Sequence, residues 1–590
     1  MNQTLSEIEF ETRTIGPLVL TTPFLRRLGL RETINRLCPV AEQADFDYGL
    51  VAELVVQCRL TDPRALYDMP GWAAQYEIAA LYPDVDEANQ LNDDRVGRLL
   101  DALYERRALL WGEVIARAAR AYAIDLSRLH ADTMPIKFAG LFADQPVNDT
   151  VPRLEPGYNP QGEWVQQLKL FALAAGDGRL PVWFDALSGG TGDSPTYVPQ
   201  FEAFCQHAQL ATLLPLQEVI VIGDRKMPTV DNQLAWLRLG VSYIGPTTMQ
   251  DSHRQALRTL LDEGQSWTAL PYVAGRETDK DKDDRTVYRG VGHTVALTDA
   301  DTGVAYPVRH LYVSSSALAQ HEAQRRQAEM SAIEAEIQRM QGLVNKYDYK
   351  SPEIIVRRVQ EKAFKKRAAR HYFDIQVVEH AERPTTPYAL QYTIDHEGVE
   401  SDAALDGVYL LVAGGPAAHW DDASLLQEWK GQYKVEHCFR LTNQLFLCGP
   451  VFLKNSQRIV SLILLIMVGC LVAGLIERQM RRALAERHEP IHGLMPEGRD
   501  TLKPTVARIL RAFADYSLVL IKWADGRLLQ RQFARPNPVQ QQILNVLEMP
   551  HPEALFGAPL PLAIPSGASC VDGGLKMAGL RRWGVMALIA

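Results

Sequence analysis

The chain has 590 residues, 47% of them hydrophobic, and a formal net charge of −9. That length allows about three or four domains of ordinary size, and the composition is that of a globular protein. The negative charge excludes a uniformly basic surface, so any site for nucleic acid has to be a local patch. The seven cysteines form no C-x-x-C pair, which argues against a zinc knuckle or a disulfide framework and favours a reducing, cytoplasmic environment.

Residues 1–123 are predicted to form a mostly helical domain, because apolar residues recur with helical period over 49–60 and 95–123. A small helical domain of this kind can bind DNA, or it can serve only packing or dimerisation. The sequence leaves both open. The first ten residues contain acids and lack the apolar stretch of a secretory signal.

Residues 124–245 change to short apolar strands that alternate with helices, in the predicted order β-β-β-α-β-α-β. Asp132 is expected just past the first strand and Asp224 just past the fourth. Carboxylates at the ends of adjacent strands converge on one edge of a mixed sheet, where α/β folds place their ligands. The segment therefore predicts the first part of an α/β core.

Residues 246–405 are predicted to form an inserted β-rich subdomain with two helices, near 316–347 and 353–371. The second helix carries seven Lys or Arg residues and one Glu between positions 357 and 370. A basic helix is usually a solvated face, but this one could also bind phosphates. The candidate phosphate contacts are Arg357, Arg358, Lys365, Lys366 and Arg367.

The core is expected to resume over 406–485, with a strand at 406–413 and an amphipathic helix at 421–446 that carries Glu436. A helical C-terminal segment over 486–549 and a poorly ordered tail over 550–590 complete the prediction. The run at 459–476 has no charged residue and reaches about the lower limit of a membrane helix. Its glycines favour a helix buried in the protein core, and we expect no membrane segment.

Three acids placed in this way can hold two Mg²⁺ or Mn²⁺ ions about 3.5 to 4 Å apart, one on each side of a phosphodiester. The three are Asp132, Asp224 and Glu436, and Arg440 would lie on the same helical face as Glu436 to bind a phosphate. Local sequence alone favours a purely structural interpretation, in which Glu436 is a surface residue paired with Arg440 four residues later.

Other polar features are predicted to be structural. The turn SGGTGDS at 188–194 predicts a helix N-cap at Asp193 or Ser194. His130 and His437 stand beside two of the acids in sequence, and packing roles are expected for both.

Four motifs in this order resemble a bacterial insertion-sequence DDE transposase: LHADTM around Asp132, the GGTGD turn at 189–193, VIGDRKM around Asp224 and YKVEHCFR around Glu436. The branch it resembles has a ribonuclease-H-like core interrupted by a β-rich insertion domain, and the resemblance runs over roughly residues 14–549. It implies that Asp132, Asp224 and Glu436 are a metal-bound catalytic triad that cuts and joins DNA. It also implies double-stranded DNA as partner, both element ends and target, and a homodimer or higher assembly.

The sequence departs from that branch around Glu436. The signature positions for Tyr, Arg and Lys hold Trp429, Gln432 and Asn443, although Tyr433, Lys434 and Arg440 lie close by and could contact phosphates. The alternatives are therefore a catalytically impaired or domesticated DNA-binding relative, and a metal-dependent nuclease that does not join strands.

Overall fold

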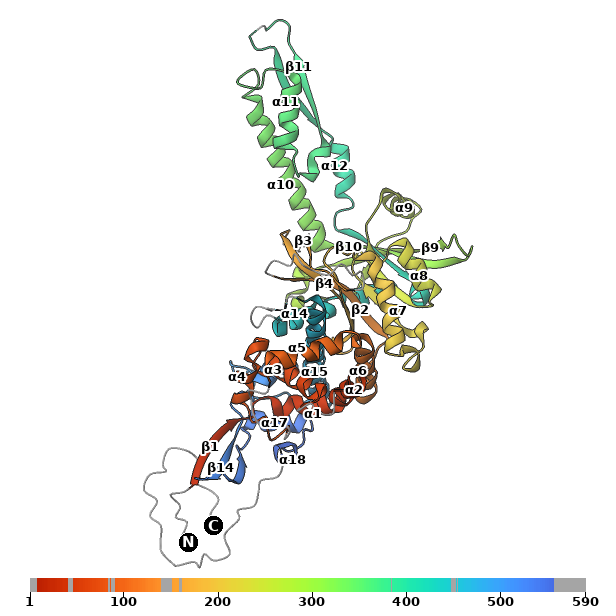
Figure 1. Cartoon of the computed structure of the whole chain (residues 1–590). Helices are drawn as coiled ribbons and strands as arrows, with labels where there is room; N and C mark the ends of the chain where they lie inside the picture. The colour runs from red at the N-terminus through yellow and green to blue at the C-terminus, as the bar shows by residue number, and fades with distance from the viewer. Residues whose placement is uncertain are drawn as a thin grey trace, which may run out of the picture.

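The computed structural model describes residues 8–40, 46–82, 85, 91–138, 151–158, 162–383, 385–446, 453 and 455–556. A large mixed sheet and its covering helices form the body, and an elongated arm projects from one end of it (Figure 1). The fold is α/β.

The core of the sheet has the strand order β5-β4-β2-β6-β7. Its first three strands in the chain are antiparallel, and β6 and β7 then run parallel to β2. The bounds are β2 (Arg128–Lys137), β4 (Trp164–Ala175), β5 (Pro181–Ser188), β6 (Ile220–Gly223) and β7 (Ser242–Thr247), with helices α7 (Tyr197–His207) and α8 (Val230–Arg238) between the later strands. This order confirms the predicted β-β-β-α-β-α-β arrangement and the ribonuclease-H-like core.

The sheet does not end at β7. Strand β13 (Val408–Gly414) pairs antiparallel with β7, and β10 (Ala305–Ser315), β9 (Tyr288–Thr298) and β8 (Thr268–Leu270) follow in turn. Most strands of the segment expected to form a separate insertion thus extend the core sheet. Each added strand satisfies the open N–H and C=O groups of the edge before it, which a sequence pattern cannot reveal.

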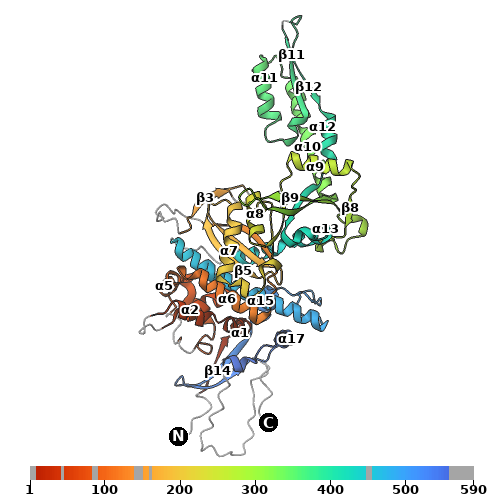
Figure 2. The ribbon, with the colours of Figure 1, turned by 90° about the vertical axis from the view of Figure 1, so that its right-hand side faces the viewer.

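The arm has a hydrophobic core of its own, separate from that of the body. Figures 1 and 2 show it as a long helix and a two-stranded hairpin that rise away from the sheet. Its elements are α10 (Ser316–Gln341), α11 (Pro352–Arg358), β11 (Phe373–Glu379), β12 (Tyr388–Ile394) and α12 (His396–Ala403), with α9 (Asp251–Asp262) near its base.

The basic segment predicted as one helix near 353–371 is interrupted. Helix α11 ends at Arg358, a π-helical turn spans Val359–Ala363, and a 3-10 helix follows at Ala368–Tyr372. Lys366 lies between them with a left-handed φ of 60°, a conformation that no α-helix contains. Composition predicted the helical character, but not this break.

The N-terminal helices pack around one long apolar helix, α15 (Ser456–Arg487), and share its core with the sheet. These helices are α1 (Leu18–Leu28), α2 (Leu30–Leu37), α3 (Tyr48–Thr61), α4 (Met69–Gln75), α5 (Asp93–Tyr104) and α6 (Arg107–Tyr122). By length and composition α15 could cross a membrane, but 94% of its apolar window is buried inside the protein. This burial confirms the interpretation of the apolar run as a core helix.

The two ends of the described chain meet in a small sheet. Strand β1 (Ile8–Thr14) pairs with β14 (Ser517–Trp523), which pairs with β15 (Leu528–Phe533). The C-terminal segment predicted as helical therefore also contains strands, because β14 is stabilised by a partner strand about five hundred residues away. Helices α16 (Val506–Arg511), α17 (Pro538–Val546) and α18 (Pro552–Phe556) complete the segment. Residues 557–590 of the predicted tail lie outside the described residues, and the cysteines within the described part are free.

Candidate active site

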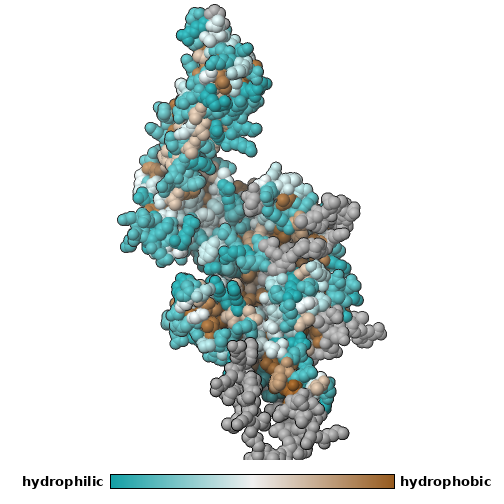
Figure 3. Space-filling view, turned by 90° about the vertical axis from the view of Figure 1, so that its left-hand side faces the viewer, coloured by the Kyte–Doolittle hydropathy of each residue, from teal (hydrophilic) through white to brown (hydrophobic). Residues whose placement is uncertain are grey.

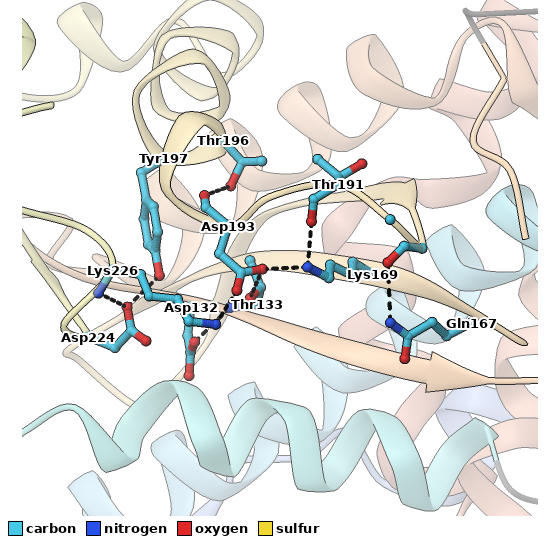
Figure 4. Close-up of polar contacts among 12 residues, drawn as sticks. Asp132, Thr133, Gln167, Lys169, Thr191, Asp193, Thr196, Tyr197, Asp224 and Lys226 are labelled. Carbon is cyan, nitrogen blue, oxygen red and sulfur yellow. Dashed lines mark hydrogen bonds and ion pairs between the residues drawn. The ribbon is translucent and has the colours of Figure 1, made fainter. Parts of the chain in front are cut away.

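Strand register places Asp132 beside Asp224. Strands β2 and β6 pair in parallel from Arg128 opposite Ile220 to Ala131 opposite Gly223, so the next position on each strand is one of the two aspartates. Neighbouring strands lie about 4.8 Å apart, and paired residues share a face. Figure 4 shows both carboxylates at this end of the sheet. Asp132 lies within β2 rather than past its end, because pairing with β4 continues the strand to Lys137.

Helix α14 (Tyr433–Phe446) crosses the same face of β2 and brings Glu436 to it. Side chains two apart on a strand share a face, so His130, Asp132 and Met134 all point the same way. Gln432, just before the helix, contacts the His130 ring at 3.4 Å, and Asn443 contacts Met134 Sδ at 3.4 Å. Glu436 follows Gln432 by one helical turn, near enough to Asp132 for its charge to act on that carboxylate. Figure 4 shows α14 as the pale helix below the aspartates.

The pKa of Asp132 reports this convergence. Burial raises it, and the negative charges of Asp224, Glu436 and Asp193 raise it further, to about 7, against a hydrogen bond from the Thr133 N–H. The structure thus brings the three predicted acids together, and a fourth acid with them. Glu436 is the most exposed of the four.

Asp193 is the N-cap residue of the 3-10 helix Ser194–Thr196, as the sequence predicts, but its carboxylate makes no capping bond and lies beside the acids instead. One oxygen accepts hydrogen bonds from Thr133 Oγ1 at 3.0 Å and Lys169 Nζ at 2.9 Å, and the other accepts one from Lys226. Burial would raise the pKa of Asp193, but the hydrogen bonds from Lys226 and Lys169 outweigh it and hold the pKa below its ordinary value. Figure 4 shows this network beside Asp132.

Tyr197 orients Asp224. The Tyr197 hydroxyl donates to Asp224 Oδ1 at 2.8 Å, and the Lys226 backbone N–H donates to the same oxygen at 3.0 Å. Burial, followed by the charges of Asp224 and Asp132, raises the pKa of Tyr197 far above its ordinary range, so its hydroxyl remains a donor. Sequence reasoning missed Tyr197, Lys169, Lys226 and the role of Asp193. The only signal was Lys226, two residues after Asp224.

The donor set fits divalent cations in its chemistry. Lys169 and Lys226 both pair with Asp193, and Asp132, Asp224 and Glu436 have no ion-pair partner among the described residues. Carboxylate oxygens without counter-ions are the ligands that Mg²⁺ and Mn²⁺ take. Within the described ranges no three His, Cys, Asp or Glu side chains stand close enough to hold one ion as they lie. Binding of one ion by three of these side chains would require rotamer changes, most easily at the exposed Glu436.

The residues near Glu436 have different surroundings. Arg440 donates to His437 Nδ1 at 2.6 Å, and Tyr433 is 51% exposed with the Arg179 guanidinium above its ring. The Lys434 ammonium turns inward, toward Gly431 and Gly176. Of the three, Arg440 and Tyr433 are thus the ones open to solvent.

The altered signature positions pack the helices. Gln432 Nε2 donates to the Ala131 carbonyl at 2.9 Å, so together with Asn443 it holds α14 against β2. Trp429, in helix α13 (Asp422–Lys430), packs against Tyr409 with ring centroids 5.2 Å apart. His130 is fully buried between strand and helix, as the packing prediction required.

The basic residues of the arm lie away from the acids, at the far end of the molecule (Figure 1). Arg357 and Arg358 lie within ion-pair distance of Glu361, and Arg367 donates to the Ala363 carbonyl at 2.6 Å. Lys365 and Lys366 are exposed and have no acidic partner in the described part of the chain. These two lysines carry part of the uncompensated charge of the segment.

Residues 10–111 match a family model described as a domain of unknown function, DUF4277. No protein of curated function matches the sequence. Among solved structures, a piggyBac transposase in a synaptic complex with hairpin DNA is similar, with 8% identity and a TM-score of 0.34, over 86% of this chain and 82% of that chain. A Mos1 transposase in a paired-end complex with the left transposon end has 10% identity and a TM-score of 0.14, over 38% and 74% of the two chains. TM-scores this low do not establish a common fold.

Proposed function

We propose that the protein is a DNA transposase of an insertion sequence. One observation carries the proposal: three acids from distant segments, Asp132 on β2, Asp224 after β6 and Glu436 on α14, meet on one face of the sheet, with no counter-ion among the described residues. In a ribonuclease-H-like core, such an arrangement suits metal-dependent chemistry on a phosphodiester. The reaction would free a 3′-hydroxyl at each element end and direct it at target DNA.

The acids would hold two Mg²⁺ or Mn²⁺ ions, which when bound supply activation of the attacking oxygen and stabilisation of the leaving oxygen. Tyr197 keeps Asp224 oriented through its 2.8 Å hydrogen bond. Asp193 holds the Lys226 and Lys169 ammonium groups beside the acids. Tyr197 and the Lys226 N–H thus fix the Asp224 carboxylate before substrate arrives, which reduces the reorganisation needed at that residue.

Double-stranded DNA is the proposed partner, both as element ends and as target. Arg440 and Tyr433 are exposed beside Glu436, and Lys365 and Lys366 are exposed on the arm, whose surface is mainly hydrophilic in Figure 3. Basic patches of this kind bind phosphates even on an acidic protein. Joining two ends requires two active sites, so we propose a homodimer or higher assembly on DNA in the bacterial cytoplasm.

The test is a supercoiled-plasmid assay with labelled element ends, in Mg²⁺ or Mn²⁺ and in EDTA. We expect Asp132→Asn, Asp224→Asn and Glu436→Gln each to lower cleavage and strand transfer by a hundredfold or more, roughly the loss seen when a group essential to catalysis is removed. Glu428→Gln is the matched control, because Glu428 lies on α13 and pairs with Arg128 at 3.6 Å, outside the site. Full metal-dependent strand transfer by any of the first three variants would remove that residue from the triad.

A second candidate is favoured by the altered signature positions. Trp429, Gln432 and Asn443 are used for packing, as their contacts with Tyr409, Ala131 and Met134 show. A protein that cleaves DNA without joining it, or that binds DNA without cleaving it, would keep the fold and lose the Tyr, Arg and Lys of the signature. The same assay separates the three activities, because nicked, joined and unaltered plasmids migrate differently.

A further inference from the structure

Arginines from three segments gather on the solvent side of α14, next to Glu436. Arg440 belongs to α14, Arg179 to the turn between β4 and β5, and Arg481 to α15. On a helix, residues three and four apart are neighbours, so Tyr433, Glu436 and Arg440 share one face. The cluster therefore begins within one helical turn of the acids.

Arg179 is held in place from two sides. Gly178 before it has a left-handed φ of 80° and lies so close to α15 that an added Cβ would stand 2.6 Å from Arg478 Cδ. Arg478 in turn binds both carboxylate oxygens of Asp177, at 2.8 and 2.5 Å. The Arg179 guanidinium then lies 5.3 Å above the centre of the Tyr433 ring, within cation–π distance.

The charge of the cluster is not balanced among the described residues. The acid that pairs with it, Glu477 on α15, is buried and already accepts hydrogen bonds from Arg481 and from the Val506 N–H, each at 2.8 Å. Neither Arg179 nor Arg440 has a carboxylate within ion-pair distance in the part of the chain that the structure describes. Both guanidinium groups therefore keep unpaired charge at the surface.

We propose that Arg179 and Arg440 bind backbone phosphates of the DNA strand that enters the active site, with Tyr433 and Arg481 positioning them. Guanidinium groups donate in a planar fork that matches phosphate oxygens. The inference rests on the proposed function. It also accounts for the altered signature. The three acids are retained, while Gln432 and Asn443 stand where the resembling transposases have Arg and Lys, and two arginines from other positions would supply the phosphate contacts.

The test compares Arg179→Ala/Arg440→Ala with a matched pair, Arg482→Ala/Arg487→Ala. The control removes the same charge from the neighbouring helix, where Arg482 pairs with Glu486 at 2.7 Å and Arg487 with Glu548 at 3.5 Å. Equilibrium binding of a fluorescent DNA duplex is measured over a series of salt concentrations in EDTA. Each phosphate contact contributes about 0.9 to the slope of log K against log salt, so the first pair should lower the slope by about 2.

We expect that pair also to weaken binding about tenfold or more at low salt, and Arg179→Lys/Arg440→Lys to recover most of the slope because the charges are restored. Circular dichroism and the melting temperature show that each variant is folded. An unchanged slope in the alanine pair, or an equal loss of slope in the control pair, overturns the inference about Arg179 and Arg440. The proposed transposase function is still supported in that case if the wild type cleaves DNA. If the alanine pair lowers the salt slope as expected but the wild type never cleaves DNA in the presence of metal, the proposed function is overturned and the phosphate site is still supported.

Discussion

Asp132 is the residue at which the electrostatics of the site is most visible. Its carboxylate is partly buried, and the charges of Asp224, Glu436 and Asp193 oppose its ionisation. In such a site the ionised carboxylates repel one another, and a bound cation would remove that repulsion. The free protein should therefore be less stable with Asp132 ionised than with Asp132 protonated.

This has a testable pH dependence. The folded pKa of Asp132 is about 7, above the ordinary value of 3.8, so the folded state binds the proton more tightly than the unfolded state. Stability is then lost as the pH rises between these values. We expect Asp132→Asn to be more stable than the wild type at pH 8 in EDTA, by up to about 4 kcal/mol, and equal to it near pH 4, measured by urea unfolding.

Mg²⁺ should raise the stability of the wild type at pH 8 and leave Asp132→Asn less affected, because the ion binds the folded carboxylates. The exposed Asp283 serves as control: Asp283→Asn should show no such difference between the two pH values. An Asp132→Asn variant no more stable than the wild type at pH 8 would contradict this account.

The sequence could predict the acids because each follows a recognisable pattern: Asp132 and Asp224 come with apolar strands, and Glu436 with an amphipathic helix. It could not predict Asp193, whose role depends on Lys169 from β4 and on Lys226 from the turn after β6. In the loop sequence a helix cap was the better local explanation. Contacts between segments far apart in the chain leave no periodic pattern in the local sequence, so they cannot be predicted from it.

At the scale of elements, α15 is the helix around which the body is built. Its apolar run was predicted as a core helix from glycines among large residues, and Gly474 shows why: an added Cβ would stand 2.7 Å from Leu180 Cδ2. Leu180 is fully buried at the start of β5, so it has no free space to yield. The close approach of helix and strand depends on the missing side chain.

We expect Gly474→Val to destabilise the protein by about 1 to 3 kcal/mol, the usual cost of overpacking a core. Leu180→Ala alone should cost about 2 to 5 kcal/mol through the cavity it leaves. The double variant should cost less than the sum, since each change relieves the other, and urea unfolding of all four proteins measures the coupling. Strict additivity would mean that the two residues are not in contact.

Strand order was predictable for the core, because each strand there is a short apolar run between turns or helices. The return of the core at 406–413 was predicted, and β13 does pair with β7. The strands beyond β13 were not predictable as part of this sheet: β10 looks like a strand of any β-rich domain, and only its pairing with β13 joins it to the core. The small terminal sheet was missed for the same reason. Its β14 reads SLVLIKW, and pairing with β1 decides its conformation.

At the scale of the whole molecule, the arm offers a second surface for contact with DNA, apart from the acids. Its own core allows it to hold a rigid shape at a distance from the acids, as Figure 2 shows, and its hydrophilic surface is seen in Figure 3. Lys365 and Lys366 are exposed there without acidic partners in the described chain. Such a projection can reach DNA outside the catalytic face.

We expect Lys365→Gln/Lys366→Gln to weaken binding of long DNA duplexes and to lower the salt slope by up to about 2, because two phosphate contacts are lost. Arg357→Gln/Arg358→Gln should have a smaller effect, since Glu361 already lies close to both guanidinium groups. Anisotropy titrations with short and long duplexes measure this. Equal losses from the two pairs would show that local pairing does not decide which charges the DNA uses.

The pairing of β1 with β14 has a consequence for synthesis of the protein. Glu11 and Lys522, joined by an ion pair of 2.6 Å, are 511 positions apart in the chain. At roughly 5 to 20 residues per second on the ribosome, β1 waits about 25 to 100 s for its partner to be made. Throughout that time it is an unpaired strand edge, exposed to other nascent chains. A product that terminates before β14 would never cover that edge, and aggregation or proteolysis of truncated copies is the expected fate.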